Sequence, residues 1–267
     1  MREPFTPAVA RQHLLGAITV GIYPLRMDGT VCFLALDVDV ARAAPGSPAS
    51  AEPFERRLRA AHGVARAIAD AAAATDLPCL LEDSGHKGRH VWILFERPVP
   101  AAAARRLADS LLERAGRLPP GISIEVFPRQ SRVAAGGLGN LIKLPLGVHR
   151  LTGRRCLLLD PASGHPIEQP MQLLADLPRV SRETLRGLVQ TAASATGPRL
   201  WDASARDSED EPGNVSSDEE AAEDVASGRV QGPSSSMPAR GTSPLPEEAP
   251  YDPARDVPLQ AMLARCP

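Results

Sequence analysis

The run at residues 31–39 limits most strongly what this chain can fold into. It reads Val-Cys-Phe-Leu-Ala-Leu-Asp-Val-Asp and follows a turn signal at Asp28-Gly29, which predicts a short buried strand. Because side chains alternate along a strand, Asp37 and Asp39 project from the same face. Two carboxylates so close repel each other unless a cation lies between them, and a hard divalent ion would supply that charge. The alternative is a solvated strand end, since D-x-D also occurs by chance.

Composition and cysteine spacing exclude several classes of protein. No apolar stretch approaches the roughly 20 residues needed to cross a bilayer, and the N-terminus lacks the apolar core of a signal peptide. The four cysteines are widely spaced with no C-x-x-C pair, so we expect no structural zinc in residues 1–200. These features predict a cytoplasmic protein that has no membrane partner.

The formal net charge of −2 conceals an uneven distribution along the chain. Residues 1–200 hold 25 basic and 18 acidic side chains, a net charge of +7, whereas residues 201–267 hold 5 basic and 14 acidic ones. A basic body suits a polyanionic partner. Residues 201–250 are too poor in large apolar side chains to bury a core, which predicts a disordered linker. Residues 251–267 regain some apolar periodicity, and we expect them to begin a truncated C-terminal helical domain.

Hydrophobic periodicity predicts an α+β domain over residues 1–200. Helices are expected at residues 8–15, 53–74, 101–116, 170–176 and 181–193. Strands are expected at residues 17–23, 31–39, 79–81, 90–95, 122–127, 140–146 and 155–159.

A basic, glycine-containing segment joins two of these strands. It reads Ser84-Gly-His-Lys-Gly-Arg-His90, and its glycines allow a tight turn close to a ligand. Hydroxyl, imidazole, ammonium and guanidinium groups all donate to phosphate oxygens. It is not a Walker A loop, because a strand and not a helix follows. The alternative is a solvated basic turn.

Three further residues add to the candidate site. Glu125 interrupts a strand-like stretch and would give a two-metal site its third carboxylate, although a lone glutamate on a strand is often only a surface residue. Lys143 lies in an apolar strand, where an ammonium needs either a protein carboxylate or a ligand phosphate as its partner. His149 follows at the strand end and could hold a ribose or a phosphate.

The order of these motifs resembles the archaeo-eukaryotic primase superfamily. The order is D-x-D, then S-G-x-x-G-x-H, then a third acid, then N-L-I-K-L-P-x-x-x-H-x-x-T-G. One branch is more similar still, the primase-polymerases of CRISPR loci and mobile-element conflict systems. The resemblance covers about residues 10–165 and rests on the segments at residues 21–25, 33–39, 88–95, 125–130 and 139–146.

The resemblance implies a catalytic core with an RRM-like antiparallel sheet flanked by helices, and a role for each candidate residue. The metal-binding acids, for two Mg²⁺ or Mn²⁺ ions, correspond to Asp37, Asp39 and Glu125. The triphosphate-binding residues correspond to Ser84, Lys87 and His90. A second pair for phosphate and sugar corresponds to Lys143 and His149, with His86, Arg89 and Asn140 as neighbours. The third acid is glutamate where many relatives have aspartate; it remains a hard-oxygen ligand.

The implied activity is template-dependent nucleotidyl transfer by a DNA primase-polymerase. Its substrates would be nucleoside triphosphates and a single-stranded DNA or RNA template with primer, and its partners CRISPR adaptation or helicase proteins. Two alternatives remain open, a non-catalytic single-stranded nucleic-acid-binding module and a metal-dependent nuclease. Neither needs both phosphate-binding segments together with all three acids.

Overall fold

An antiparallel sheet organises the part of the chain that the structure describes, which is residues 5–42, 52–133 and 139–193 of this computed structural model. The strands of this sheet within those ranges are β2 (Thr30–Val40), β3 (Leu80–Asp83), β4 (Gly88–Pro100), β5 (Ile122–Phe127) and β7 (Leu158–Leu159). Their order is β5-β2-β4-β3-β7, and each strand is antiparallel to its neighbours. A separate short ladder pairs β1 (Gly21–Ile22) with β6 (Ile142–Lys143).

Helices between the strands complete a β-α-β-β-α-β unit. The described helices are α1 (Pro7–Leu14), α3 (Phe54–Ala73), α4 (Ala101–Ala115), α5 (Pro170–Asp176) and α6 (Arg182–Ala193). The chain runs β2-α3-β3-β4-α4-β5, the split βαβ connectivity that RRM-like and ferredoxin-like domains share. The predicted α+β fold with an RRM-like sheet flanked by helices is therefore confirmed.

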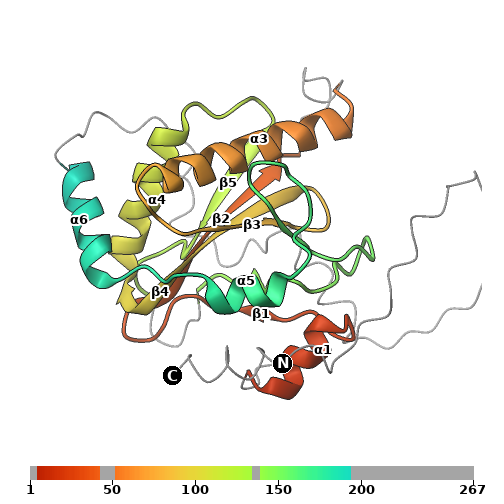
Figure 1. Cartoon of the computed structure of the whole chain (residues 1–267), viewed down its shortest axis with the longest axis horizontal. Coiled ribbons are helices and arrows are strands. Elements are labelled where there is room, and N and C mark those ends of the chain that lie inside the picture. The colour runs from red at the N-terminus through yellow and green to blue at the C-terminus, as the bar shows by residue number, and fades with distance from the viewer. Residues whose placement is uncertain (1–4, 43–51, 134–138, 194–267) are drawn as a thin grey trace, which may run out of the picture. The chain divides into compact units, whose positions relative to one another are not determined.

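The two faces of the sheet have different cores. On one face, Leu36 and Val91 pack with Ala65 and Ile68 of α3 and Leu107 of α4, among other buried residues. Figure 1 shows α3 and α4 along this side of the sheet, with α6 next to α4. The opposite face has a smaller core. It combines buried Ala35, Trp92 and Phe127 of the sheet with Ile142 and with Leu174 of α5.

Most expected elements are found within a few residues of their predicted bounds, but three strands are shorter than expected. The strand expected at 155–159 is reduced to β7. Residues 17–20 do not join the expected strand at 17–23, because the Ala17 and Ile18 amides donate back to the Gln12 carbonyl at the end of α1. The strand expected at 140–146 is reduced to β6. Pro145 has no amide to donate to a ladder, and Leu146 has a positive φ of 67°, so the chain turns there.

Several expectations cannot be compared with the structure. The predicted linker at residues 201–250 and the helical segment at 251–267 lie outside the described residues. Among the described helices, none is both long and apolar enough to cross a membrane.

Candidate active site

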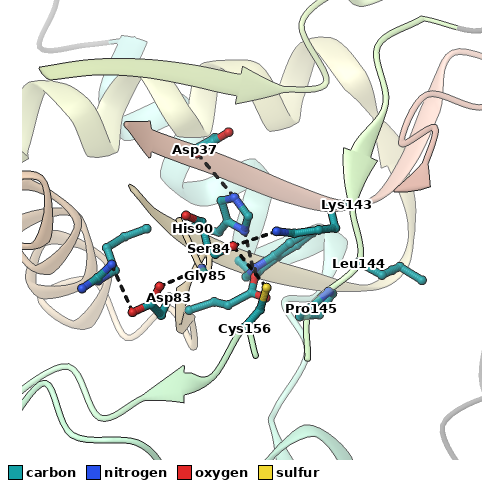
Figure 2. A network of polar contacts seen from close by, with 12 residues as sticks. Asp37, Asp83, Ser84, Gly85, His90, Lys143, Leu144, Pro145 and Cys156 are labelled. Atoms are coloured by element: carbon teal, nitrogen blue, oxygen red, sulfur yellow. Dashed lines mark hydrogen bonds and ion pairs between the residues drawn. The ribbon is translucent and has the colours of Figure 1, made fainter. Parts of the chain in front are cut away.

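The strand register brings the predicted acids together on one face of the sheet. Glu125 of β5 pairs with Asp37 of β2, Asp37 pairs with His90 of β4, and His90 pairs with Glu82 of β3. Directly paired residues project from the same face, so these four side chains form one row across four strands. Asp39 lies one pleat further along β2 on the same face, opposite Gly88. This is the face away from α3 and α4 (Figure 2).

Each of the three predicted metal-binding carboxylates contacts a basic side chain. His90 Nε2 lies 3.4 Å from Asp37 Oδ1, and Lys87 Nζ lies 3.0 Å from Asp39 Oδ2. Arg129 Nε lies 3.0 Å from Glu125 Oε1. The row of acids is thus neutralised locally by side chains of the chain itself.

His90 is held between two carboxylates. Its side chain is buried, and its Nδ1 lies 2.8 Å from Glu82 Oε2 while its Nε2 faces Asp37. Burial by itself lowers the pKa of this imidazole, but the charges of Asp37 and Glu82 outweigh it and raise the pKa to about 9. At neutral pH the ring is an imidazolium that donates from Nδ1 to Glu82 and forms an ion pair with Asp37 through Nε2.

The segment between β3 and β4 forms a tight polar loop. Ser84 Oγ accepts hydrogen bonds from the Gly88 amide at 3.1 Å and the His86 amide at 3.4 Å, while Asp83 Oδ1 accepts from the Gly85 amide at 2.7 Å. A Cβ at Gly88 would collide with the carboxylate of Asp39 and a neighbouring carbonyl. Glycine at this position therefore lets the loop approach the second acid closely.

A second segment, residues 143–156, encloses the other side of this loop. Lys143 is buried, and its Nζ donates to the Ser84 carbonyl at 2.7 Å, as Figure 2 shows. The rings of His149 and His86 have centroids 4.9 Å apart, and Thr152 Oγ1 donates to the Gly85 carbonyl at 2.7 Å. The structure thus brings together the two basic segments that the sequence singled out.

One predicted neighbour, Arg89, projects away from the row of acids. Arg89 alternates with His90 along β4, so it projects from the opposite face, where it contacts Asp83 at 3.3 Å and donates to His62 Nδ1 of α3 at 3.4 Å. Burial lowers the pKa of Arg89, a shift that the Asp83 charge opposes. Asn140 lies two residues before β6 and is partly exposed.

Sequence reasoning missed Glu82 and Arg129. Glu82 ends an apolar run just as Asp37 does, so an acid at a strand end was the available signal. Only the register of β3 against β4 shows that it meets His90. Arg129 lies four residues after Glu125, a spacing that carries no meaning until the turn after β5 is known.

The donor set fits hard divalent ions, although it is not a preformed cage. Carboxylate oxygens are the ligands that Mg²⁺ prefers, and Mg²⁺ in phosphoryl-transfer sites takes one or two carboxylates together with substrate phosphates. Within the described ranges, no three His, Cys, Asp or Glu side chains lie close enough to hold one ion in common. The basic side chains that contact Asp37, Asp39 and Glu125 show that each carboxylate has room for a positively charged group beside it.

Comparison with known families agrees with this arrangement. The model of a family described as the archaeo-eukaryotic primase domain of the TOTE conflict system matches residues 1–188. This chain therefore belongs to that family, and its membership supports a primase-like nucleotidyltransferase function acting on nucleotides and nucleic acid. No curated protein matches the chain.

Proposed function

We propose that this protein is a template-dependent primase-polymerase that adds nucleotides to a 3′-hydroxyl. One observation carries the proposal. The row containing Asp37 and Glu125, with Asp39 beside it, lies next to both basic segments. A nuclease or a binding module does not need a second basic segment packed against the loop at residues 84–88. A polymerase must hold a triphosphate beside its acids.

The three carboxylates are assigned to two divalent ions, Mg²⁺ or Mn²⁺. Asp37, Asp39 and Glu125 would hold them, and their side chains are 11%, 20% and 28% exposed. When bound, such ions activate the attacking hydroxyl and neutralise charge on the leaving pyrophosphate. The antiparallel register fixes the relative height of Asp37 and Glu125 on the sheet, so the fold sets the spacing of these two ligands before any ion arrives.

The basic segments are assigned to the triphosphate. Ser84, Lys87 and His90 are proposed to bind its oxygens, with His86 beside them. Charge-assisted hydrogen bonds from such groups are short and strong, and they stabilise the negative charge that develops during phosphoryl transfer. Lys143 and His149 are proposed for the second phosphate and sugar position, with Asn140 near the start of that segment.

Arg89 has a different part in this proposal. Because its guanidinium bonds Asp83 on the opposite face of the sheet, it supports the loop from behind instead of contacting the nucleotide. The Asp83 carboxylate in turn accepts the Gly85 amide, and Arg89 Nη1 donates to the Gly88 carbonyl at 2.7 Å. Arg89 therefore supports the loop at residues 84–88 both through Asp83 and directly.

The proposed setting is the cytoplasm, with single-stranded DNA or RNA as template and CRISPR adaptation or helicase proteins as partners. The cysteines in the described residues, Cys32, Cys79 and Cys156, are free thiols, which suits a reducing compartment. Co-purification of the full chain with candidate adaptation and helicase proteins tests the partners.

The activity is tested by incubating the protein with a labelled single-stranded template, with or without primer, and with Mg²⁺ or Mn²⁺. Deoxynucleotides and ribonucleotides are supplied in separate reactions. Primer extension supports the proposal, and product without primer adds de novo priming. Template cleavage without incorporation would favour the nuclease, and template binding with neither reaction would favour the binding module.

A further inference from the structure

Glu82 is a fully buried carboxylate that the proposed chemistry does not use. It is 0% exposed, and a buried carboxylate is costly unless it is paired and hydrogen-bonded. Three donors surround it. Oε2 accepts from Trp92 Nε1 at 2.8 Å and lies 2.8 Å from His90 Nδ1, while Oε1 accepts from the Leu146 amide at 3.3 Å.

The first consequence of this arrangement concerns His90. Because Glu82 takes the Nδ1–H, the ring is turned so that Nε2 faces Asp37, 3.4 Å away. A carboxylate behind one ring nitrogen commonly fixes the orientation of a functional histidine. His90 is 1% exposed, and Trp92 packs edge-on against it with centroids 5.8 Å apart, so the ring has little room for another orientation.

The second consequence concerns the segment that carries Lys143 and His149. Leu146 lies midway between them and has a φ of 67°, in a region that a leucine rarely occupies. Such a conformation persists only where the surrounding structure imposes it. The Glu82 carboxylate supplies one of the contacts that impose it, since Oε1 accepts the Leu146 amide.

We propose that Glu82 is a positioning residue for nucleotide binding. One carboxylate sets the direction of His90 and, through Leu146, the course of the segment from Lys143 to His149. His90 and the segment from Lys143 to His149 come from distant parts of the chain. Both contact the same carboxylate, that of Glu82 on β3. This inference rests on the proposed function, because it assigns those groups to the triphosphate.

The variant Glu82→Gln tests this role with little change in volume. An amide has one oxygen and one NH₂ group. If its oxygen faces His90 and Trp92, its NH₂ meets the Leu146 amide, and if it is reversed the NH₂ meets the other two donors. One set of contacts is lost in either orientation, so the nucleotide-binding groups are no longer held together.

The expected result is a rise of about tenfold in the KM for the nucleotide, by analogy with partners that orient metal-ligating histidines, whose loss costs about tenfold or more in affinity or activity. We expect kcat to change less than about threefold, because a positioning residue acts on nucleotide binding. The matched control is Glu96→Gln, the same substitution at an exposed position of β4. It touches neither His90 nor Leu146, so its KM is expected to stay within about twofold of wild type. Equal changes in the two variants would indicate a merely structural role and would overturn the inference.

A measurement on the wild-type protein keeps the inference testable if Glu82→Gln does not fold. With ¹⁵N-labelled histidine, the Nδ1–H of His90 should give a protected downfield resonance that persists when nucleotide and Mg²⁺ are added, while the Nε2 resonance shifts. Exchange of the Nδ1–H on nucleotide addition, or an unmoved Nε2 resonance, would contradict the assigned role.

The two proposals fail in different ways. An active wild type whose nucleotide KM is unchanged by Glu82→Gln overturns the role of Glu82 and leaves the polymerase function standing. A wild type that binds nucleotide with the expected His90 shifts but incorporates none overturns the polymerase function alone. A wild type that binds no nucleotide overturns both.

Discussion

Asp37 on β2 lies directly opposite Glu125 on β5, although the two are far apart in the sequence. Like charges directly opposite on adjacent strands destabilise a sheet. Here His90 and Arg129 contact one acid each, which offsets part of that repulsion. Because two basic side chains are needed to offset the repulsion between Asp37 and Glu125, we infer that these acids serve chemistry and not the stability of the sheet.

The first prediction separates activity from stability at Glu125. Glu125→Gln removes a proposed metal ligand and one side of the repulsion. We expect nucleotide incorporation to fall at least about 100-fold, equivalent to about 2.7 kcal/mol, while the free energy of unfolding stays within about 0.5 kcal/mol. Incorporation assays and urea titrations measure the two quantities. Glu113→Gln, at an exposed position of α4, is the matched control and should change neither.

The second prediction concerns the cation on Asp39. Lys87→Met removes the ammonium that lies 3.0 Å from its carboxylate, so an incoming ion no longer competes with it. Without nucleotide, Mn²⁺ should bind up to about fivefold more tightly, corresponding to the roughly 1 kcal/mol of a partly exposed ion pair. The nucleotide KM should rise, because Lys87 is also proposed to bind phosphate. Electron paramagnetic resonance of free Mn²⁺ measures the affinity.

The control for Lys87 is Arg66→Met, which removes a cation from an exposed ion pair with Asp70 on α3. It should leave Mn²⁺ affinity unchanged. Weaker Mn²⁺ binding in Lys87→Met would show that Lys87 does not compete with the ion for Asp39.

The third prediction compares two glycines. Gly88→Ala places a methyl group against the Asp39 carboxylate and a backbone carbonyl, and we expect a loss of about 1–3 kcal/mol of stability, as for other overpacked sites. Gly63 lies within α3 with nothing within 4 Å of an added Cβ, so Gly63→Ala should stabilise the fold by about 0.5–1 kcal/mol. The urea midpoints of the two variants, compared with wild type, measure both changes in stability. A neutral Gly88→Ala would mean that the loop tolerates displacement from Asp39.

Local pattern predicted much of this fold, and long-range register accounts for what it missed. Runs such as residues 31–39 carry their own strand signal, and the periodicity of 53–74 and 101–116 carries the helices. The pairing of Glu82 with His90 depends on how two strands align, which no local pattern specifies. The late start of the strand expected at 17–23 depends on backbone hydrogen bonds at the end of α1. The early end of the strand expected at 140–146 depends on Pro145 and on a strained Leu146. The direction of the Arg89 side chain, away from the row of acids, also follows from the register and not from any local pattern.

The fourth prediction concerns acid sensitivity through His13 of α1. Its Nδ1 accepts the Val20 amide at 3.1 Å, and its Nε2 lies 3.1 Å from the Leu144 and Pro145 carbonyls, so the fold needs the neutral ring. Burial lowers the pKa of His13 below 6.5. Above pH 6.5 the ring is neutral in both the folded and the unfolded state, so its contribution to the free energy of unfolding is fully present. That contribution is lost as the pH falls through the lowered folded-state value.

The measurement is the urea midpoint at pH 7.5 and pH 5.5 in wild type and in His13→Gln. The wild type should lose more stability on acidification than the variant. Taking this difference removes the contributions of other histidines, including His90, whose raised pKa acts in the opposite direction. An equal loss in both proteins would contradict the assigned neutral state of His13.

The central claim is that the acids on β2 hold the ions for nucleotide addition, and the most direct measurement compares primer extension by Asp37→Asn/Asp39→Asn with wild type. Asp70→Asn, on an exposed turn of α3, is the matched control. The account predicts extension by wild type and by Asp70→Asn in Mg²⁺ or Mn²⁺, and none above background by the double variant, which should still unfold cooperatively. Extension that persists in the folded double variant would contradict the account.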